Sequence, residues 1–340
     1  MGCLDTLKEL TQYTAVSGRE YEFAAVLKDK FSEICDSVEI DKFYNVIALK
    51  KGMGINGPRI MVLAHLDEIG FLVKSIDKNG FIKFTNVGGI DARILLSHEV
   101  IIHGKKDITG VIGAKPPHML EADEKKKAVK IDELYIDTGM DAKELKKYVS
   151  IGDAITLKSH PFFLKDNKYS SKSVDNRCGV TVLIETANEL KKLKHKPDVY
   201  FVATVQEELN LAGARITSFN IEPDIAIVVD ACHGDVPGAP KEVVFPLGKG
   251  PAIGIGPILN RELTERMLDT AKENNIPHQV DVEPGSTGTD AWATQVSKYG
   301  IPTVLVSIPV RYMHTSIETV HANDIKYAGK LISRFIAERV

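Results

Sequence analysis

Histidine and carboxylate side chains stand where four apolar runs of this sequence stop. The runs are RIMVLA, VYFVATV, IAIVV and TVLVSIP, and each has the length and composition of a buried strand. The polar residues that follow them, directly or a few positions later, are His65, Asp67, Glu207, Glu208, Asp230 and His314. If the four runs are neighbouring strands of one sheet, these side chains meet at its carboxyl-end edge, where open α/β sheets bind ligands.

A further carboxylate, Asp175, lies in SVDNRCG just ahead of a helical pattern and completes a ligand set that contains no cysteine. Imidazole and carboxylate ligands of this kind suit Zn²⁺, Co²⁺ or Mn²⁺. Three carboxylates in one place repel one another, and a pair of divalent cations compensates their charge. The sequence therefore predicts a centre of two divalent metal ions.

Each of these residues also has a purely structural interpretation. An aspartate before a helix is commonly an N-cap, and a histidine after a strand is commonly a hydrogen-bonded loop residue. Two adjacent glutamates are usually solvated surface. The prediction of a metal site rests on the convergence of five such residues, which are His65, Asp175, Glu208, Asp230 and His314.

The elements that must position these residues follow from hydrophobic spacing. Helical periodicity is present within residues 5–35, after Asp175, from about 211, around 261–274 and from about 323. These helices alternate with the strands, which predicts an α/β domain with a parallel or mixed sheet covered on both faces. Residues 69–163 differ, because short strands, frequent glycine and hairpin patterns at Asn79-Gly80 and 105–107 indicate a β-rich module. The predicted domains are 1–68 plus 164–340, with 69–163 inserted.

Composition narrows the class of partners and the compartment. Lys and Arg number 43 against 46 Asp and Glu, so a net charge of −3 predicts neither nucleic acid nor an anionic membrane as a partner. The lysine-rich runs 125–127 and 191–196 are predicted to be solvated surface. No apolar run approaches the roughly 20 residues of a membrane span, and the start lacks a signal-peptide pattern. Four scattered cysteines without a C-x-x-C pair predict reduced thiols and a cytoplasmic location.

The segments AHLDEIGF, SVDNRCG, VQEELNLAGA, VVDACHGDVPG and RYMHT, in this order, resemble the tetrahedral aminopeptidases. This is a family of dinuclear metallopeptidases that includes glutamyl and deblocking aminopeptidases and cellulase M-like proteins. The resemblance extends over essentially the whole chain. It implies a phosphorylase/hydrolase-like α/β/α catalytic domain with an inserted PDZ-like β-barrel for dimerisation or oligomerisation. It also implies assembly from dimers into a tetrahedral dodecamer.

The resemblance also implies a role for each matching residue. His65 and Asp230 would bind one ion, Glu208 and His314 the other, and Asp175 would bridge the two. Asp67 would hydrogen-bond His65 and fix its tautomer, and Glu207 would be the general base. The implied cofactors are two ions of zinc or cobalt, with manganese possible, and the implied substrates are peptides with a free N-terminus. In VVDACHGDVPG the loop departs from the family pattern, and we assign Cys232 and His233 no role.

Substrate contacts are expected from GSTGTDAWATQ, because its glycines let the backbone approach a ligand closely. Gly288, Thr289 and Asp290 are the candidate substrate-binding residues. The alternative for this stretch is a flexible loop with a helix N-cap at Thr289 or Asp290. The pocket that selects the N-terminal side chain is expected in the loops around 250–260 and 285–295.

Three other functions compete with a metal-dependent aminopeptidase. A deacylase of small amino-acid derivatives could use the same ligands. An endoglucanase requires two carboxyl groups flanking a sugar and usually aromatic platforms, and the chain has one tryptophan. An inactive scaffold is opposed by the complete ligand set together with Glu207. Removal of N-terminal residues from peptides is therefore the function that we predict.

Overall fold

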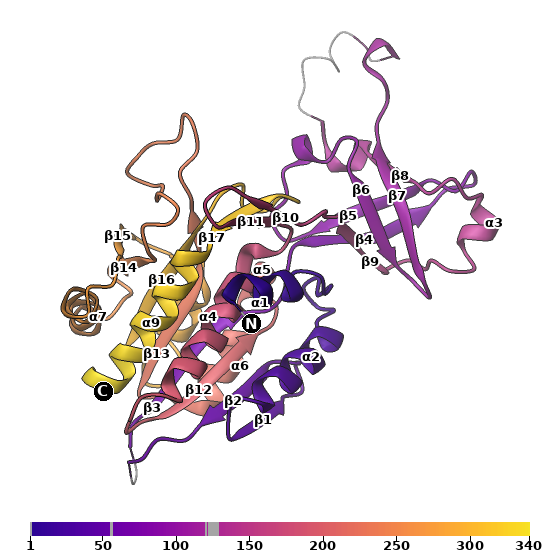
Figure 1. Ribbon diagram of the computed structural model, residues 1–340. Coiled ribbons are helices and arrows are strands. Elements are labelled where there is room, and N and C mark those ends of the chain that lie inside the picture. Colours follow the sequence, from indigo (N-terminus) through magenta and orange to yellow (C-terminus); the bar gives the residue numbers. More distant parts are fainter. Residues whose placement is uncertain (1, 55–56, 120, 122–128) are drawn as a thin grey trace.

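The computed structural model describes residues 2–54, 57–119, 121 and 129–340, which form a sheet-based body and a smaller barrel (Figure 1). The lysine-rich run 125–127 lies outside the described residues. The lysines of the run 191–196 are exposed, as expected. No helix of the described residues is both long enough and apolar enough to cross a membrane.

The larger body is built on an eight-stranded sheet of order β1-β2-β12-β3-β13-β16-β14-β15. Its members are β1 (Ser37–Ile40), β2 (Val46–Lys50), β3 (Arg59–His65), β12 (Asp198–Thr204), β13 (Ile225–His233), β14 (Ala252–Ile255), β15 (Gln279–Val282) and β16 (Thr303–Val310). The central strands β12, β3, β13 and β16 are parallel, whereas β2 and β14 pair with them antiparallel. The four apolar runs are thus neighbours in one mixed sheet, as predicted.

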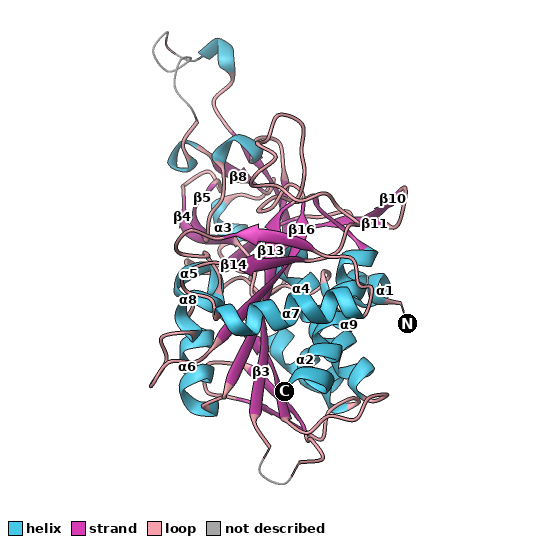
Figure 2. Cartoon of the chain, turned by 90° about the vertical axis from the view of Figure 1, so that its left-hand side faces the viewer, coloured by secondary structure: helices cyan, strands magenta, loops and turns pink. Residues whose placement is uncertain are grey.

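Helices cover both faces of this sheet (Figure 2). One face packs against α1 (Cys3–Leu10), α2 (Tyr21–Ser32), α4 (Val174–Leu190), α7 (Arg261–Glu273) and α9 (Ala322–Arg339), and the other against α6 (Ala212–Ile221) and α8 (Asp290–Thr294). Alternate residues of β3 supply the two cores, because successive side chains of a strand point to opposite faces: Ile60 and Val62 lie in the first core and Met61 in the second. The predicted α/β/α architecture is confirmed.

The inserted segment forms a closed six-stranded barrel of order β4-β5-β8-β7-β6-β9, with a hydrophobic core of its own. Its strands are β4 (Gly70–Ile76), β5 (Ile82–Val87), β6 (Glu99–His103), β7 (Asp107–Gly113), β8 (Tyr135–Asp137) and β9 (Ala154–Leu157). The short helix α3 (Ala142–Leu145) and the 3₁₀ turns Ala92–Ile94, Pro117–Met119 and Ile131–Glu133 connect them. Both predicted hairpins are present, and Gly80 in the first has a φ of +99° that favours glycine.

A small three-stranded sheet lies next to the large sheet, at the end that faces the barrel (Figure 1). It consists of β10 (Phe162–Leu164), β11 (Lys168–Ser171) and β17 (Glu318–His321), in that order and antiparallel. Among the strands that the structure describes, β10 pairs with β11 and with no barrel strand, although its first two residues fall within the expected insertion 69–163. The bounds 69–163 stay a prediction. The pairing of β11 with β17 brings the segment before Asp175 beside the segment after His314.

The helical periodicity within residues 5–35 belongs to two helices, and the segment between them is not helical. Gly18 has a φ of +85°, and residues 11–20 turn back toward the end of β3. There, the amide of Ser17 donates to the carbonyl of Glu68 at 3.2 Å. Spacing alone did not reveal this excursion, because the apolar residues on either side keep helical intervals.

Candidate metal centre

The carboxyl ends of the parallel strands open into a cavity of about 510 Å³. His65 ends β3, Asp230 lies near the end of β13, and Glu207 follows β12 by three residues. Asp175, Glu208 and His314 line the same cavity. The structure therefore brings together all the residues predicted as metal ligands, together with the predicted base.

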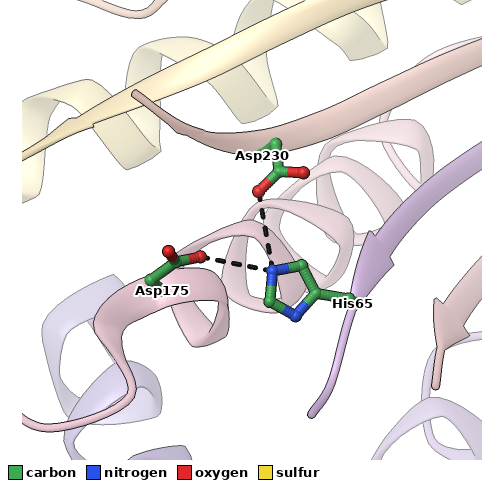
Figure 3. Close-up of side chains that lie close together, drawn as sticks. All are labelled: His65, Asp175 and Asp230. Atoms are coloured by element: carbon green, nitrogen blue, oxygen red, sulfur yellow. Dashed lines mark hydrogen bonds and ion pairs between the residues drawn. The ribbon is translucent and has the colours of Figure 1, made fainter. Parts of the chain in front are cut away.

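Asp175 lies between the two histidines, and each of its carboxylate oxygens faces one of them. Its Oδ1 is 3.2 Å from His65 Nε2, and its Oδ2 is 3.5 Å from His314 Nε2. Asp230 Oδ1 is 3.6 Å from the same nitrogen of His65 (Figure 3). Glu208 Oε1 is 3.3 Å from His314 Nε2. These side chains form two ligand groups that share Asp175, and in each group the ligand atoms lie within 4.8 Å of one another.

The backbone at Asp175 explains why this residue faces the cavity and does not act as an N-cap. Helix α4 has non-helical dihedral angles at Asp175 and Asn176. The side chain of Asn176 accepts from the amide of Gly179 at 3.0 Å, which is the bond expected of an N-cap, and its Nδ2 donates to the carbonyl of Val229 at 2.9 Å. Asn176 therefore caps the regular part of the helix and ties it to β13, which leaves the carboxylate of Asp175 available to ligands.

The side chains of Glu207 and Glu208 point in different directions because the two residues begin a helix, and not because they alternate along a strand. Strand β12 ends at Thr204, Gln206 has a left-handed φ of +57°, and the two glutamates open the one-turn helix α5 (Glu207–Asn210). Glu207 Oε2 lies 3.8 Å from His65 Nε2, whereas Glu208 reaches His314. Each glutamate thus faces a different histidine.

Asp67 makes the predicted contact with His65 and also holds the backbone of the two glutamates. Its carboxylate lies 3.5 Å from His65 Nδ1, but its backbone carbonyl is closer to that nitrogen, at 3.2 Å. A carbonyl oxygen only accepts, so the bond requires the proton on Nδ1 and leaves Nε2 free to bind metal. The carboxylate itself accepts from the amides of Glu207 at 3.1 Å and Glu208 at 3.2 Å, and from the hydroxyl of Ser17. The sequence pattern did not single out Ser17.

The electrostatics of the site match a cation-binding donor set. Burial raises the pKa of Glu207 to about 10, and the carboxylates of Asp230 and Asp290 add to that shift. Although burial acts to lower it, the pKa of His314 is raised to about 11 by hydrogen bonds to Asp175 and Glu208. Within the described part of the chain, no lysine or arginine forms an ion pair with these carboxylates. Divalent cations fit this set, since N and O donors converge where protein cations do not reach.

The predicted substrate-binding residues divide between two positions. Gly288 and Thr289 line the cavity. Thr289 is also the N-cap of α8 and accepts from the amide of Ala291. Asp290 is buried behind them and accepts from the hydroxyl of Thr204 at 2.5 Å. The stretch is therefore a loop that ends in a helix N-cap at Thr289. Its contact with substrate stays a prediction.

Several residues that the sequence analysis left without a role also line the cavity. They are Cys232, His233, Glu242, Phe245, Asp281, Glu283 and Met313. The segment 250–260, expected to shape the pocket, is absent from the described lining, because much of it forms β14 inside the sheet. Strand β15, at the sheet edge, and the loop after it take that place.

Three comparisons with known proteins agree with this geometry. A lysyl aminopeptidase of Pyrococcus furiosus is 33% identical over 98% of this chain and 96% of its own. A TET aminopeptidase structure from a marine sediment Thaumarchaeota archaeon is 33% identical, with a TM-score of 0.94 over 99% of this chain and 96% of its own. The TET1 peptidase of Pyrococcus horikoshii, which can assemble into a tetrahedron or a large octahedral shell, is 32% identical, with a TM-score of 0.85 over 99% of this chain and 100% of its own.

The sheet edge, its histidine and carboxylate set and the inserted barrel define a metal-dependent peptidase. A family described as M42 glutamyl aminopeptidase matches residues 44–331. The chain belongs to this family and is a metallo-aminopeptidase. The resemblance to the tetrahedral aminopeptidases is confirmed, and the deacylase, endoglucanase and scaffold alternatives are not favoured.

Metal binding is expected to stabilise the fold, because cations relieve the repulsion among buried carboxylates. Chelator-treated protein titrated with Zn²⁺ or Co²⁺ should gain about 2.7 kcal/mol of unfolding free energy for each site at 100 times its Kd. Differential scanning calorimetry measures the shift. The Asp175→Ala variant should lose most of it, and Asp132→Ala, an exposed barrel position, should retain it. Equal shifts in both variants would contradict the placement of the site.

Proposed function

We propose that this chain removes N-terminal residues from peptides at a centre of two divalent ions, zinc or cobalt, with manganese possible. His65 and Asp230 hold one ion, Glu208 and His314 hold the other, and Asp175 bridges them. This assignment rests on the position of Asp175 between the two histidines. Its Oδ1 lies 3.2 Å from His65 Nε2, and its Oδ2 lies 3.5 Å from His314 Nε2.

Two ions bound there supply Lewis-acid polarisation of the scissile carbonyl and a water of lowered pKa. Glu207 is the general base in this proposal. Its Oε2 lies 3.8 Å from His65 Nε2, at the rim of the ligand group, and its amide is held by Asp67. Burial raises the pKa of its carboxyl to about 10 in the absence of cations, and nearby positive charge, here that of His65, acts to lower it. From this position Glu207 accepts a proton from water and returns it to the leaving amine.

The lining of the cavity supports a peptide substrate over a glycan. The aromatic side chain in the described lining is Phe245, and the one tryptophan, Trp292, lies outside it. Sugar-binding clefts usually carry aromatic platforms. A free N-terminal amine is cationic near neutral pH, and the carboxylates of the cavity attract it. Gly288 presents a side-chain-free backbone at the wall where the substrate lies.

The Glu207→Gln variant should bind both ions with nearly wild-type affinity and lose about 10²- to 10⁴-fold in kcat, since the amide cannot take up the proton. Isothermal titration with Zn²⁺ measures binding, and mass spectrometry follows stepwise loss of residues from a short peptide. The N-acetylated twin of that peptide is the control and should stay intact. Full activity of the variant would refute the assignment of the base.

We further propose that the enzyme prefers lysine or arginine as the N-terminal residue. Asp281 and Glu283 stand two positions apart at the end of β15, so their side chains point to the same side, and both line the cavity. Burial raises the pKa of both carboxyls, and Asp281 adds to the shift of Glu283. In the described part of the chain, no lysine or arginine pairs with either.

A basic substrate side chain would compensate the negative charge of these two carboxyl groups, whereas a glutamyl side chain would add a further negative charge beside them. Glu242 adds a third acidic group to the lining. The Pyrococcus furiosus relative is named a lysyl aminopeptidase, in line with this preference, although the family description names glutamyl substrates.

Lysyl p-nitroanilide should be cleaved with at least tenfold higher kcat/KM than glutamyl p-nitroanilide. The double variant Asp281→Asn/Glu283→Gln should reduce that ratio about tenfold, which corresponds to about 1.4 kcal/mol of differential binding. Asp269→Asn, on the exposed side of α7, is the matched control and should leave the ratio unchanged. Faster hydrolysis of the glutamyl substrate by the wild type would exclude a basic preference.

We also propose that copies of this chain associate through dimers into a closed, dodecameric particle in the cytoplasm. The ability of the Pyrococcus horikoshii relative to form a tetrahedron supports this assembly. Phe162 and Leu164 on the edge strand β10 are 43% and 46% exposed, and both point away from Phe163, whose ring packs on Tyr169. Exposed apolar side chains on an edge strand are typical of a contact between copies. The inserted barrel is the second candidate for such contacts.

Light scattering on a size-exclusion column should show a particle of many subunits for the wild type. The Phe162→Glu/Leu164→Glu variant should form smaller species, because charge on this strand opposes burial. Lys165→Glu, an exposed neighbour, is the control and should keep the wild-type size. A wild-type monomer with full activity on long peptides would contradict the enclosed particle.

A further inference from the structure

A buried carboxylate outside both ligand groups connects the backbones of two ligand residues. Glu318, the first residue of β17, is 2% exposed. Its Oε2 accepts from the amide of Asp175 at 2.9 Å, and its Oε1 accepts from the amide of His314 at 2.8 Å. The two ligand residues are far apart in the sequence, and this one side chain bonds to both.

The backbones that Glu318 holds are both irregular. His314 has a left-handed φ of +62°, which is uncommon for a residue other than glycine and costs of order 1 kcal/mol or more. Asp175 has dihedral angles that do not fit the helix in which it lies. Neither conformation follows from regular secondary structure, so a tertiary contact must maintain it.

The hydrogen bonds described for the carboxylate of Glu318 are those from these two backbone amides. In the described part of the chain, no lysine, arginine or histidine side chain forms an ion pair with it. Its strand pairs with β11, in which Ser171 is its partner. A buried carboxyl group is expensive unless hydrogen bonds satisfy its oxygens. Its retention here calls for a role that a smaller apolar residue could not fill.

We propose that Glu318 is a positioning residue that sets the separation of Asp175 and His314 and thereby builds the half of the metal centre formed by Asp175, Glu208 and His314. The inference rests on the two-ion assignment proposed above. Asp67 acts in the same manner on the other ligand-bearing loop, where its carboxylate accepts from the amides of Glu207 and Glu208. Two buried carboxylates thus hold four site residues by their backbones.

The Glu318→Gln variant tests this role, because an amide keeps one acceptor oxygen but presents an NH₂ group, which cannot accept, to the second backbone amide. Metal-free protein is titrated calorimetrically with Zn²⁺. We expect one of the two ions to bind about 10- to 100-fold more weakly and the other to keep its affinity within a few fold. Loading with Co²⁺ should show a changed visible absorption spectrum for the weakened ion.

Asp324 offers a matched control within the same region of the chain. It is fully buried and accepts from the amides of Gly248 and Gly250 at 2.7 and 2.8 Å, neither of which belongs to a ligand residue. Asp324→Asn should lower the melting temperature and leave both metal affinities unchanged. A Glu318→Gln variant that behaves like Asp324→Asn, with both ions bound normally, would overturn the inference.

A more conservative variant decides the matter if Glu318→Gln does not fold. Glu318→Asp keeps two acceptor oxygens but is one methylene shorter, so it cannot reach both amides and should also weaken one ion. Wild-type affinity for both ions in this variant would overturn the inference. A wild-type protein that binds a single ion would contradict the two-ion proposal, and the role of Glu318 would then be decided by that ion's affinity in the variants.

Discussion

The burial of several carboxylates against one another is the constraint on which the rest of this structure depends. Asp175, Glu207, Glu208 and Asp230 converge on two histidines at one edge of a sheet. Without cations their repulsion and their loss of hydration oppose folding, and the raised pKa of Glu207 expresses that opposition. Such a cluster persists only if the scaffold holds it and a function requires it. Metal-dependent peptide hydrolysis is that function.

The scaffold meets this demand mainly through backbone contacts. Parallel strands deliver the site residues to one edge, but the loops after the strands set the final positions. Asp67 and Glu318 accept hydrogen bonds from the amides of those loops. Next to Asp67, the carboxylate of Glu68 accepts from Lys172 at 2.7 Å and from the amide of Ala15 at 2.9 Å. These buried polar groups are satisfied by specific partners, and such networks favour one arrangement over its alternatives.

The parts of the molecule divide the tasks of the enzyme between them. The eight-stranded sheet and its helices carry the chemistry, and the edge strand β15 supplies the acidic wall through Asp281. The barrel has a hydrophobic core of its own, and the segment between β5 and β6 brings Gly89 beside His314. It stays a candidate for the proposed contacts between copies. The small sheet β10-β11-β17 joins these tasks, because one of its outer strands is exposed and apolar while the other carries Glu318.

Sequence patterns by themselves determined the α/β/α class, the inserted β module and the set of residues at the strand ends, because strand periodicity and apolar length are local properties. They also placed Asp175, Glu207 and His314 in one site through the order of their motifs. Only the tertiary structure decided which groups hold that site. The break between α1 and α2 that brings in Ser17, the left-handed turn at Gln206 and the two amides shared by Glu318 join segments far apart in the chain. Such contacts leave no periodic signal, since each depends on the packing of the whole domain and not on its neighbours in sequence.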